Sequence, residues 1–255
     1  MKKAMIIAVI LIFAGCMILG SVMTMLNWDF SKLSTVQYET NTYEIRETFD
    51  SISVTTRTAD VRFALSDDGT CQVECVEEEN ANHRVAVEDG TLIIEWKESP
   101  IRHIGINMGS PSVTVWLPAA EYGAVTVHVS TGSIQMEQIS ADTLELEVST
   151  GRVNLTDITC GNLTATGSTG DLSLKNVIAE GGFFLERGTG DVNFEGCDAG
   201  EIVVNTGTGD VTGTFLTGKL FVAESSTGKV VVPETTTGGR CEVTTSTGDI
   251  KLEIK

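Results

Sequence analysis

Apolar and polar positions in the second half of the chain repeat at a nearly constant interval. The tripeptide Ser/Gly-Thr-Gly recurs seven times, and its copies are 19, 19, 20, 19, 19 and 20 residues apart. Its threonines are Thr131, Thr150, Thr169, Thr189, Thr208, Thr227 and Thr247. An interval this regular indicates one supersecondary unit repeated along the chain.

Each copy has the same apolar columns around its threonine. Residues six and four positions before it are mostly apolar, as are those three and five positions after it. Two period-2 strands, each with one apolar face, are predicted on either side of a Thr-Gly turn. One such coil cannot bury its apolar face alone, but stacked coils bury it together. We therefore expect an all-β fold, a parallel β-solenoid of 19–20 residues per coil. Coils with two sides and with three sides both fit.

The chain before the repeats is less regular. Residues 48–120 are expected to form an irregular β cap, with an early coil at 52–63 and a hairpin around Asp89 and Gly90. Residues 28–47 are predicted to be a polar stalk, and residues 121–255 the regular solenoid. The last residues, 249–255, alternate charged and apolar side chains. This alternation suggests either protection of an open terminal edge or a docking edge for a partner.

The N-terminal segment predicts a membrane anchor. Residues 4–26 contain no charged side chain, and a helix of this length reaches about 35 Å. Lys2 and Lys3 precede it, which favours a cytoplasmic N-terminus and a single pass, with the C-terminal body outside the cytoplasm. Two alternatives stay open: a cleaved signal peptide, and lipidation at Cys16, which ends a lipobox-like Phe-Ala-Gly-Cys.

Charge narrows the classes of partner. The chain has a net charge of −18, and residues 28–255 carry 15 basic against 35 acidic side chains. Such a body repels nucleic acid, so no nucleic-acid partner is expected. It also repels anionic lipids and polymers, whereas cations and basic partners remain compatible.

The six cysteines fit neither a metal motif nor a disulfide framework. Cys71 and Cys75 lie on one predicted strand, about 13 Å apart when extended. Cys160, Cys197 and Cys241 occupy core or small-residue columns, where a thiol acts as a small apolar group.

Candidate chemistry is sparse. Asp171, Asp191 and Asp210 share one column, two residues after the threonine, and would lie roughly 5 Å apart in stacked coils. Three such carboxylates could bind a divalent cation, with calcium the candidate, although aspartate is also a common turn residue. No other cofactor is expected. His83, His103 and His128 form no catalytic pattern, and the constant coil length leaves no insertion for a cleft, so an enzyme is not expected.

The repeat S-T-G-D-[IV]-x-[LF] and the closing 246–255 segment resemble a bacterial putative-adhesin family of unknown function. The resemblance covers about residues 40–255 and implies a surface role without catalytic residues. Some relatives resemble accessory proteins of envelope stress systems. The expected function is a non-enzymatic cell-surface binding or scaffold protein that contacts an envelope protein or polymer. The alternatives are a regulator of an envelope stress response and a carbohydrate-active β-helix enzyme. Arg152, Gly188, Gly207 and Lys229 depart from the motif.

Overall fold

The computed structural model describes residues 2–29, 37–79, 81–97 and 109–255. It is an all-β protein with one N-terminal helix, α1 (Lys2–Met25). The predicted all-β class is therefore confirmed. Within α1, residues Met5–Met25 are long and apolar enough to cross a membrane, and apart from Met23, which is 2% exposed, the large apolar side chains of this segment are exposed.

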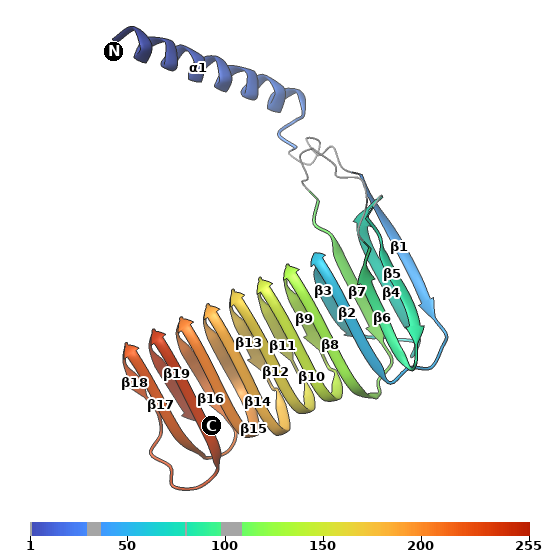
Figure 1. Ribbon diagram of the computed structural model, residues 1–255, viewed down its shortest axis with the longest axis vertical. Coiled ribbons are helices and arrows are strands. Elements are labelled where there is room, and N and C mark those ends of the chain that lie inside the picture. The colour runs from blue at the N-terminus through green and yellow to red at the C-terminus, as the bar shows by residue number, and fades with distance from the viewer. Residues whose placement is uncertain (1, 30–36, 80, 98–108) are drawn as a thin grey trace.

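The repeats form two ladders of strands that face each other across a thin core (Figure 1). Each repeat gives one strand to each ladder, so a coil has two sides. The first ladder contains β8 (Glu121–Thr131), β10 (Ser140–Thr150), β12 (Thr159–Thr169), β14 (Ile178–Thr189), the second half of β15 (Val192–Thr208), β19 (Gly239–Thr247) and β17 (Lys219–Thr227). The second contains β9 (Ile134–Glu137), β11 (Val153–Thr156), β13 (Leu172–Lys175), the first half of β15, β16 (Val211–Phe215), β20 (Ile250–Ile254) and β18 (Val230–Val231).

Strand pairing in this part is parallel and keeps each sequence column in line. Thr131 pairs with Thr150, and Thr150 with Thr169. The apolar columns are buried between the ladders, where phenylalanine rings pack against one another within a coil and between neighbouring coils. The ring centroids of Phe183 and Phe194 lie 6.3 Å apart, and those of Phe194 and Phe215 lie 5.0 Å apart. Fully burying such a side chain contributes about 1.5–3 kcal/mol.

The Thr-Gly turn requires glycine for two reasons. Gly151 has a φ of 147°, a conformation that other residues resist. A Cβ atom at this position would also lie 1.9 Å from the carbonyl oxygen of Gly132 in the neighbouring coil. The turn predicted from the repeat is therefore confirmed.

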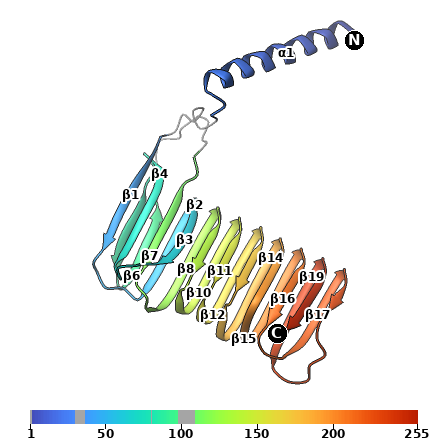
Figure 2. The same ribbon diagram turned by 180° about the vertical axis from the view of Figure 1, so that it is seen from behind.

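The last coil does not stack in chain order. Strands β19 and β20 lie between the β15–β16 coil and the β17–β18 coil, as Figure 2 also shows from behind. The expectation that the C-terminal strand forms the open edge is wrong, because β20 pairs on both sides. The outer coil is also less buried: Cys241 and Ile250 in the inserted coil are fully buried, whereas Val230, which pairs with Ile250 from the outer coil, is 40% exposed.

The outer coil carries features that limit edge pairing. Strand β18 has only two residues, and Pro233 follows shortly after it. A short edge strand and a nearby proline both discourage another chain from adding to the sheet. The charged residues of β20 have a different role: Lys251 and Glu253 form an ion pair of 3.1 Å on the outer face.

The cap contains the remaining strands and adds antiparallel pairing. The coil of β2 (Ser51–Thr58) and β3 (Asp60–Leu65) lies between β8–β9 and the pair β6 (Thr91–Trp96) and β7 (Ser112–Leu117). Strand β5 (His83–Glu88) forms the predicted hairpin with β6, and β4 (Cys71–Glu78) pairs antiparallel with β7 and β1 (Tyr38–Ile45). Both ladders are thus mixed. Strand β1 falls within the segment 28–47 that was predicted to be a stalk, while residues 30–36 lie outside the described part of the chain.

Candidate functional site

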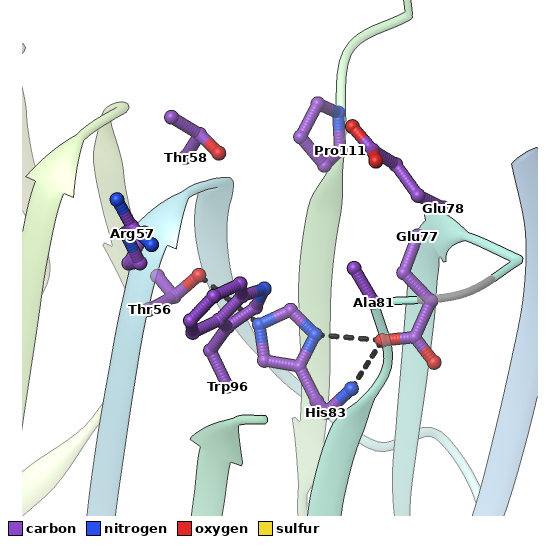
Figure 3. Close-up of a pocket in the computed structure, with 9 residues that line it drawn as sticks. All are labelled: Thr56, Arg57, Thr58, Glu77, Glu78, Ala81, His83, Trp96 and Pro111. Atoms are coloured by element: carbon purple, nitrogen blue, oxygen red, sulfur yellow. Dashed lines mark hydrogen bonds and ion pairs between the residues drawn. The ribbon is translucent and has the colours of Figure 1, made fainter. Parts of the chain in front are cut away.

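A pocket of about 180 Å³ opens in the cap (Figure 3). This volume corresponds to roughly six water molecules. Its lining comes from four strands, from Ala81 between β4 and β5, and from the residue that precedes β7: Thr56, Arg57, Thr58, Glu77, Glu78, Ala81, His83, Trp96 and Pro111. The pocket therefore depends on the antiparallel strands of the cap and on the β2–β3 coil, and no residue of the regular repeats lines it.

A buried carboxylate lies at the base of this pocket. Glu77 is 1% exposed because it occupies an inward position of β4, in line with the buried Val73 and Cys75. It accepts hydrogen bonds from the backbone nitrogen of His83 at 2.6 Å, from His83 Nδ1 at 2.7 Å and from Asn41 Nδ2 at 2.8 Å. Burial alone would raise the pKa of Glu77, but these hydrogen bonds outweigh burial and lower it.

The imidazole of His83 connects this carboxylate to a hydroxyl group. With Glu77 ionised, Nδ1 carries the proton, and Nε2 accepts from the Thr56 hydroxyl at 3.0 Å. The order carboxylate, imidazole, hydroxyl is that of nucleophilic triads. However, Thr56 is only 3% exposed, and the network gives each of these buried groups a partner. The arrangement therefore fixes the pocket base rather than presenting an accessible nucleophile.

The rim of the pocket combines an aromatic ring with a cation. The guanidinium of Arg57 lies over the Trp96 ring, with Cζ 4.8 Å from the ring centroid. This is a cation–π contact. Trp96 is half-buried and lies opposite His83 in the β5–β6 hairpin. A ligand in the pocket would thus meet an indole surface at the side and hydrogen-bonding groups around it.

The residues at the base of the pocket also belong to a cluster of side chains that commonly bind metal ions. Cys75 Sγ, a Glu77 carboxylate oxygen and a His83 ring nitrogen all lie within 4.8 Å of one another, and all three residues are buried. The side chains of Cys75 and Glu77 point to the same face because they are two residues apart on β4.

The three aspartates singled out in the sequence also come together, on the outside of the stack. The backbone nitrogen of Asp191 donates to Asp171 Oδ1 at 3.1 Å, and that of Asp210 donates to Asp191 Oδ1 at 2.8 Å. Because of the inserted coil, Asp249 continues the column and donates to Asp210 Oδ1 at 2.7 Å. Each carboxylate thus accepts a turn amide of the next coil, which accounts for the recurring aspartate without a cation.

Calcium binding by this column stays a prediction, and one substitution tests it. Asp210→Asn keeps the acceptor oxygen, so it should leave the free energy of unfolding nearly unchanged. Asp210→Ala removes the hydrogen bond and should cost about 0.5–1.5 kcal/mol. If calcium binds, the wild-type melting temperature rises with calcium, and both variants reduce that rise.

His128, one of the other two histidines considered in the sequence, lies away from this pocket. His128 is on the outer face of β8, where Nδ1 lies 2.8 Å from Glu147 Oε2. His103 lies outside the described residues. The Thr56–His83–Glu77 network was missed because its members come from three strands. The available signal was the alternation of β4, which places Glu77 inside although it begins a run of three glutamates.

Comparison with known proteins agrees with this architecture. The Toastrack DUF4097 family matches residues 49–255. The chain belongs to this family. No curated protein matches this Toastrack chain.

The Toastrack chain is similar in structure to a putative adhesin from Bacteroides fragilis NCTC 9343, with a TM-score of 0.54 and 18% identity, over 85% of this chain and 97% of that one. It is also similar to a putative lipid binding protein from Parabacteroides distasonis ATCC 8503, with a TM-score of 0.46 and 17% identity, over 86% and 98% of the two chains. At these identities the first comparison supports the fold alone.

Proposed function

We propose that this Toastrack protein is a non-enzymatic binding protein of the cell envelope. In this proposal α1 anchors it in the membrane in a single pass. The two ladders form a parallel β-solenoid that stands outside the cytoplasm. The length and apolar surface of α1, and Lys2 and Lys3 before it, support this topology. The adhesin name of the similar B. fragilis protein agrees with a surface role.

The observation that carries the proposal is the cap pocket. It combines the Trp96 ring, the Arg57 guanidinium and the Thr58 hydroxyl in a volume of about 180 Å³. A sugar ring has C–H groups on one face and hydroxyls at its edge, so it matches an indole flanked by hydrogen-bonding groups. The acidic body disfavours anionic polymers. The proposed ligand is therefore a neutral or amino-substituted sugar residue of an envelope glycan.

Glycan capture by the full chain in lipid nanodiscs tests the pocket. We expect immobilised neutral or amino-sugar glycans to retain the wild type, and Trp96→Ala to reduce retention at least tenfold. Trp116→Ala is the matched control, because Trp116 lies in the cap on β7 but does not line the pocket. Equal retention of wild type and Trp96→Ala would refute binding at this pocket.

The same assay separates the pocket from the flanks of the stack. Glu145 is exposed on the flank of β10, which β8 separates from β2 of the cap, and it does not line the pocket. Charge reversal at this position, Glu145→Lys, should leave glycan retention unchanged. If Glu145→Lys abolishes retention and Trp96→Ala does not, the binding surface is the flank of the ladders.

The topology has its own test. A tag after residue 255 should react with a membrane-impermeant reagent on intact cells. A tag that reacts only after the cells are lysed would place the body in the cytoplasm. If the wild type is labelled with palmitate and Cys16→Ser is not, the anchor is a lipid attached at Cys16 and not a membrane-spanning helix.

A further inference from the structure

The cap holds three buried ligand-type side chains around one point. Cys75 is 0%, Glu77 1% and His83 5% exposed. One atom from each lies within 4.8 Å of the other two. We infer that Cys75, Glu77 and His83 form a site for a zinc-like divalent transition metal, open toward the cap pocket. This inference does not rest on glycan binding, because it concerns the metal alone.

The ligand chemistry selects the metal class. A thiolate and an imidazole together favour zinc and its neighbours over calcium and magnesium, which prefer oxygen. Three protein ligands with one open position are typical of zinc sites that keep a water or ligand in the fourth place. Glu77 and His83 both line the pocket, so the pocket provides the fourth position and a route of entry.

The distances require only a local adjustment. Zinc bonds of about 2.0–2.3 Å place tetrahedral ligand atoms about 3.3–3.8 Å apart. No pair in the cluster is separated by more than 4.8 Å, so the farthest atoms approach by at most about 1.5 Å. The ion would replace the proton now shared between His83 Nδ1 and Glu77 Oε2, whose separation is 2.7 Å.

Electrostatics in the cap favour a cation at this point. The carboxylates of Glu77 and Glu74 both act electrostatically on the Cys75 thiol, so negative charge is concentrated at this point. A bound dication would neutralise this charge and would hold the coordinating thiol in its deprotonated form. The net charge of −18 also increases the local concentration of cations around the protein.

His83 has a supporting contact of the kind that metal-bound histidines use. When Nδ1 binds a metal, Nε2 carries the remaining proton and can donate it to the Thr56 hydroxyl oxygen at 3.0 Å. The hydroxyl then accepts rather than donates. Thr56 is therefore a positioning residue for the ring in both states.

Cobalt and zinc titrations of the full chain in detergent test the site. We expect one Co²⁺ per chain, with a near-ultraviolet charge-transfer band from a thiolate ligand, and displacement of this band by Zn²⁺. Cys75→Ser should abolish the band, and His83→Gln should weaken binding at least about 10-fold. Cys71→Ser is the matched control, because Cys71 is a buried cysteine of the same strand outside the cluster.

The wild type alone also gives a decisive readout, in case a variant fails to fold. Zn²⁺ added after chelator treatment should raise its melting temperature, whereas Ca²⁺ and Mg²⁺ should not. A wild type without the Co²⁺ band, or a band that survives Cys75→Ser, would overturn the inference. Glycan retention is measured separately, in the presence of chelator, so that the outcome of the glycan assay does not bear on the metal site.

Discussion

Arg187 is a charged side chain in the core whose replacement should stabilise the protein. It lies on β14 and is 1% exposed. Within the described residues, none of its three guanidinium nitrogens has a hydrogen-bond partner. Burial lowers the pKa of Arg187, although the charge of Asp171 opposes the shift. The guanidinium of Arg187 fits in the core because the residue opposite it in the neighbouring coil, Gly167, has no side chain. A Cβ atom at Gly167 would lie 1.9 Å from Arg187 Nη1.

The size of the effect follows from this environment. An unsatisfied buried polar group costs about 1–3 kcal/mol, and a charged one costs more. Replacing buried charges by apolar groups of similar volume often stabilises a protein by about 1–4 kcal/mol. Arg187→Met keeps an unbranched side chain and loses under about 1.5 kcal/mol of packing. We therefore expect the free energy of unfolding to rise by about 2 kcal/mol, and the melting temperature by about 4–8 °C.

Thermal and urea unfolding of the full chain, followed by far-ultraviolet circular dichroism, measures this change. Arg152→Met is the control, because the Arg152 side chain is 71% exposed and contacts Asp171 only at 3.6 Å. Its effect should be within about 0.5 kcal/mol. If Arg187→Met lowers the melting temperature by several degrees, the guanidinium has a strong partner in solution, such as a buried anion or water, and the reasoning fails.

Three further predictions concern the stacking order and the buried polar groups. Cysteines replacing Asn205 and Thr244 should form a disulfide, because these residues pair on adjacent strands. The pair Asn205→Cys and Glu224→Cys should not form a disulfide, because β19 lies between these two positions and separates them by two strand spacings, about 9.6 Å in total, which exceeds the reach of a disulfide. A disulfide in this second pair and none in the first would show that the coils stack in chain order. Asp198→Ala should lower the free energy of unfolding, measured by urea titration, by about 3–5 kcal/mol, because Lys219 is 3% exposed and loses its ion-pair partner. A loss below about 1 kcal/mol would mean that the ammonium group of Lys219 reaches water. The five buried cysteines should resist maleimide until urea unfolds the body, because burial raises their thiol pKa values, and rapid labelling of the folded chain would contradict their placement.

The regular coils could be predicted because every copy repeats the same columns around the same turn. The order of the last coils could not. In a parallel ladder, the copies at Thr208, Thr227 and Thr247 can stack in any order and keep Thr beside Thr. Local features of the copy at Thr227 distinguish it from the other two. Pro233 interrupts the strand that follows Thr227, and Lys219 stands in a column that is mostly glycine in the other copies. These details make the middle copy a poor interior coil, and the final copy takes its place.

The candidate site lay beyond sequence reasoning for a related reason. Each of its side chains is ordinary by itself, and Glu77 within a run of glutamates is typical of an exposed turn. Only the antiparallel pairing of β4 and β5 with their neighbours brings Glu77 to His83. Thr56 joins them from the β2–β3 coil, which the sequence placed in the cap but could not orient toward the hairpin.

The division between the cap and the array indicates where function resides in this Toastrack chain. In an in-register parallel ladder, each side chain meets its own column, so like lies beside like, as the Asp171–Asp191–Asp210 column illustrates. Such an array gives length and rigidity, and within its described residues no thiol, carboxylate and imidazole come together at one point. Mixed clusters need strands that run in opposite directions or leave the repeat. The cap provides both, and it is also the part of the body that follows α1 most closely in the chain. In the proposed topology, with α1 in the membrane, a ligand or metal bound in the cap is held nearer to the membrane along the chain than one bound on the later coils.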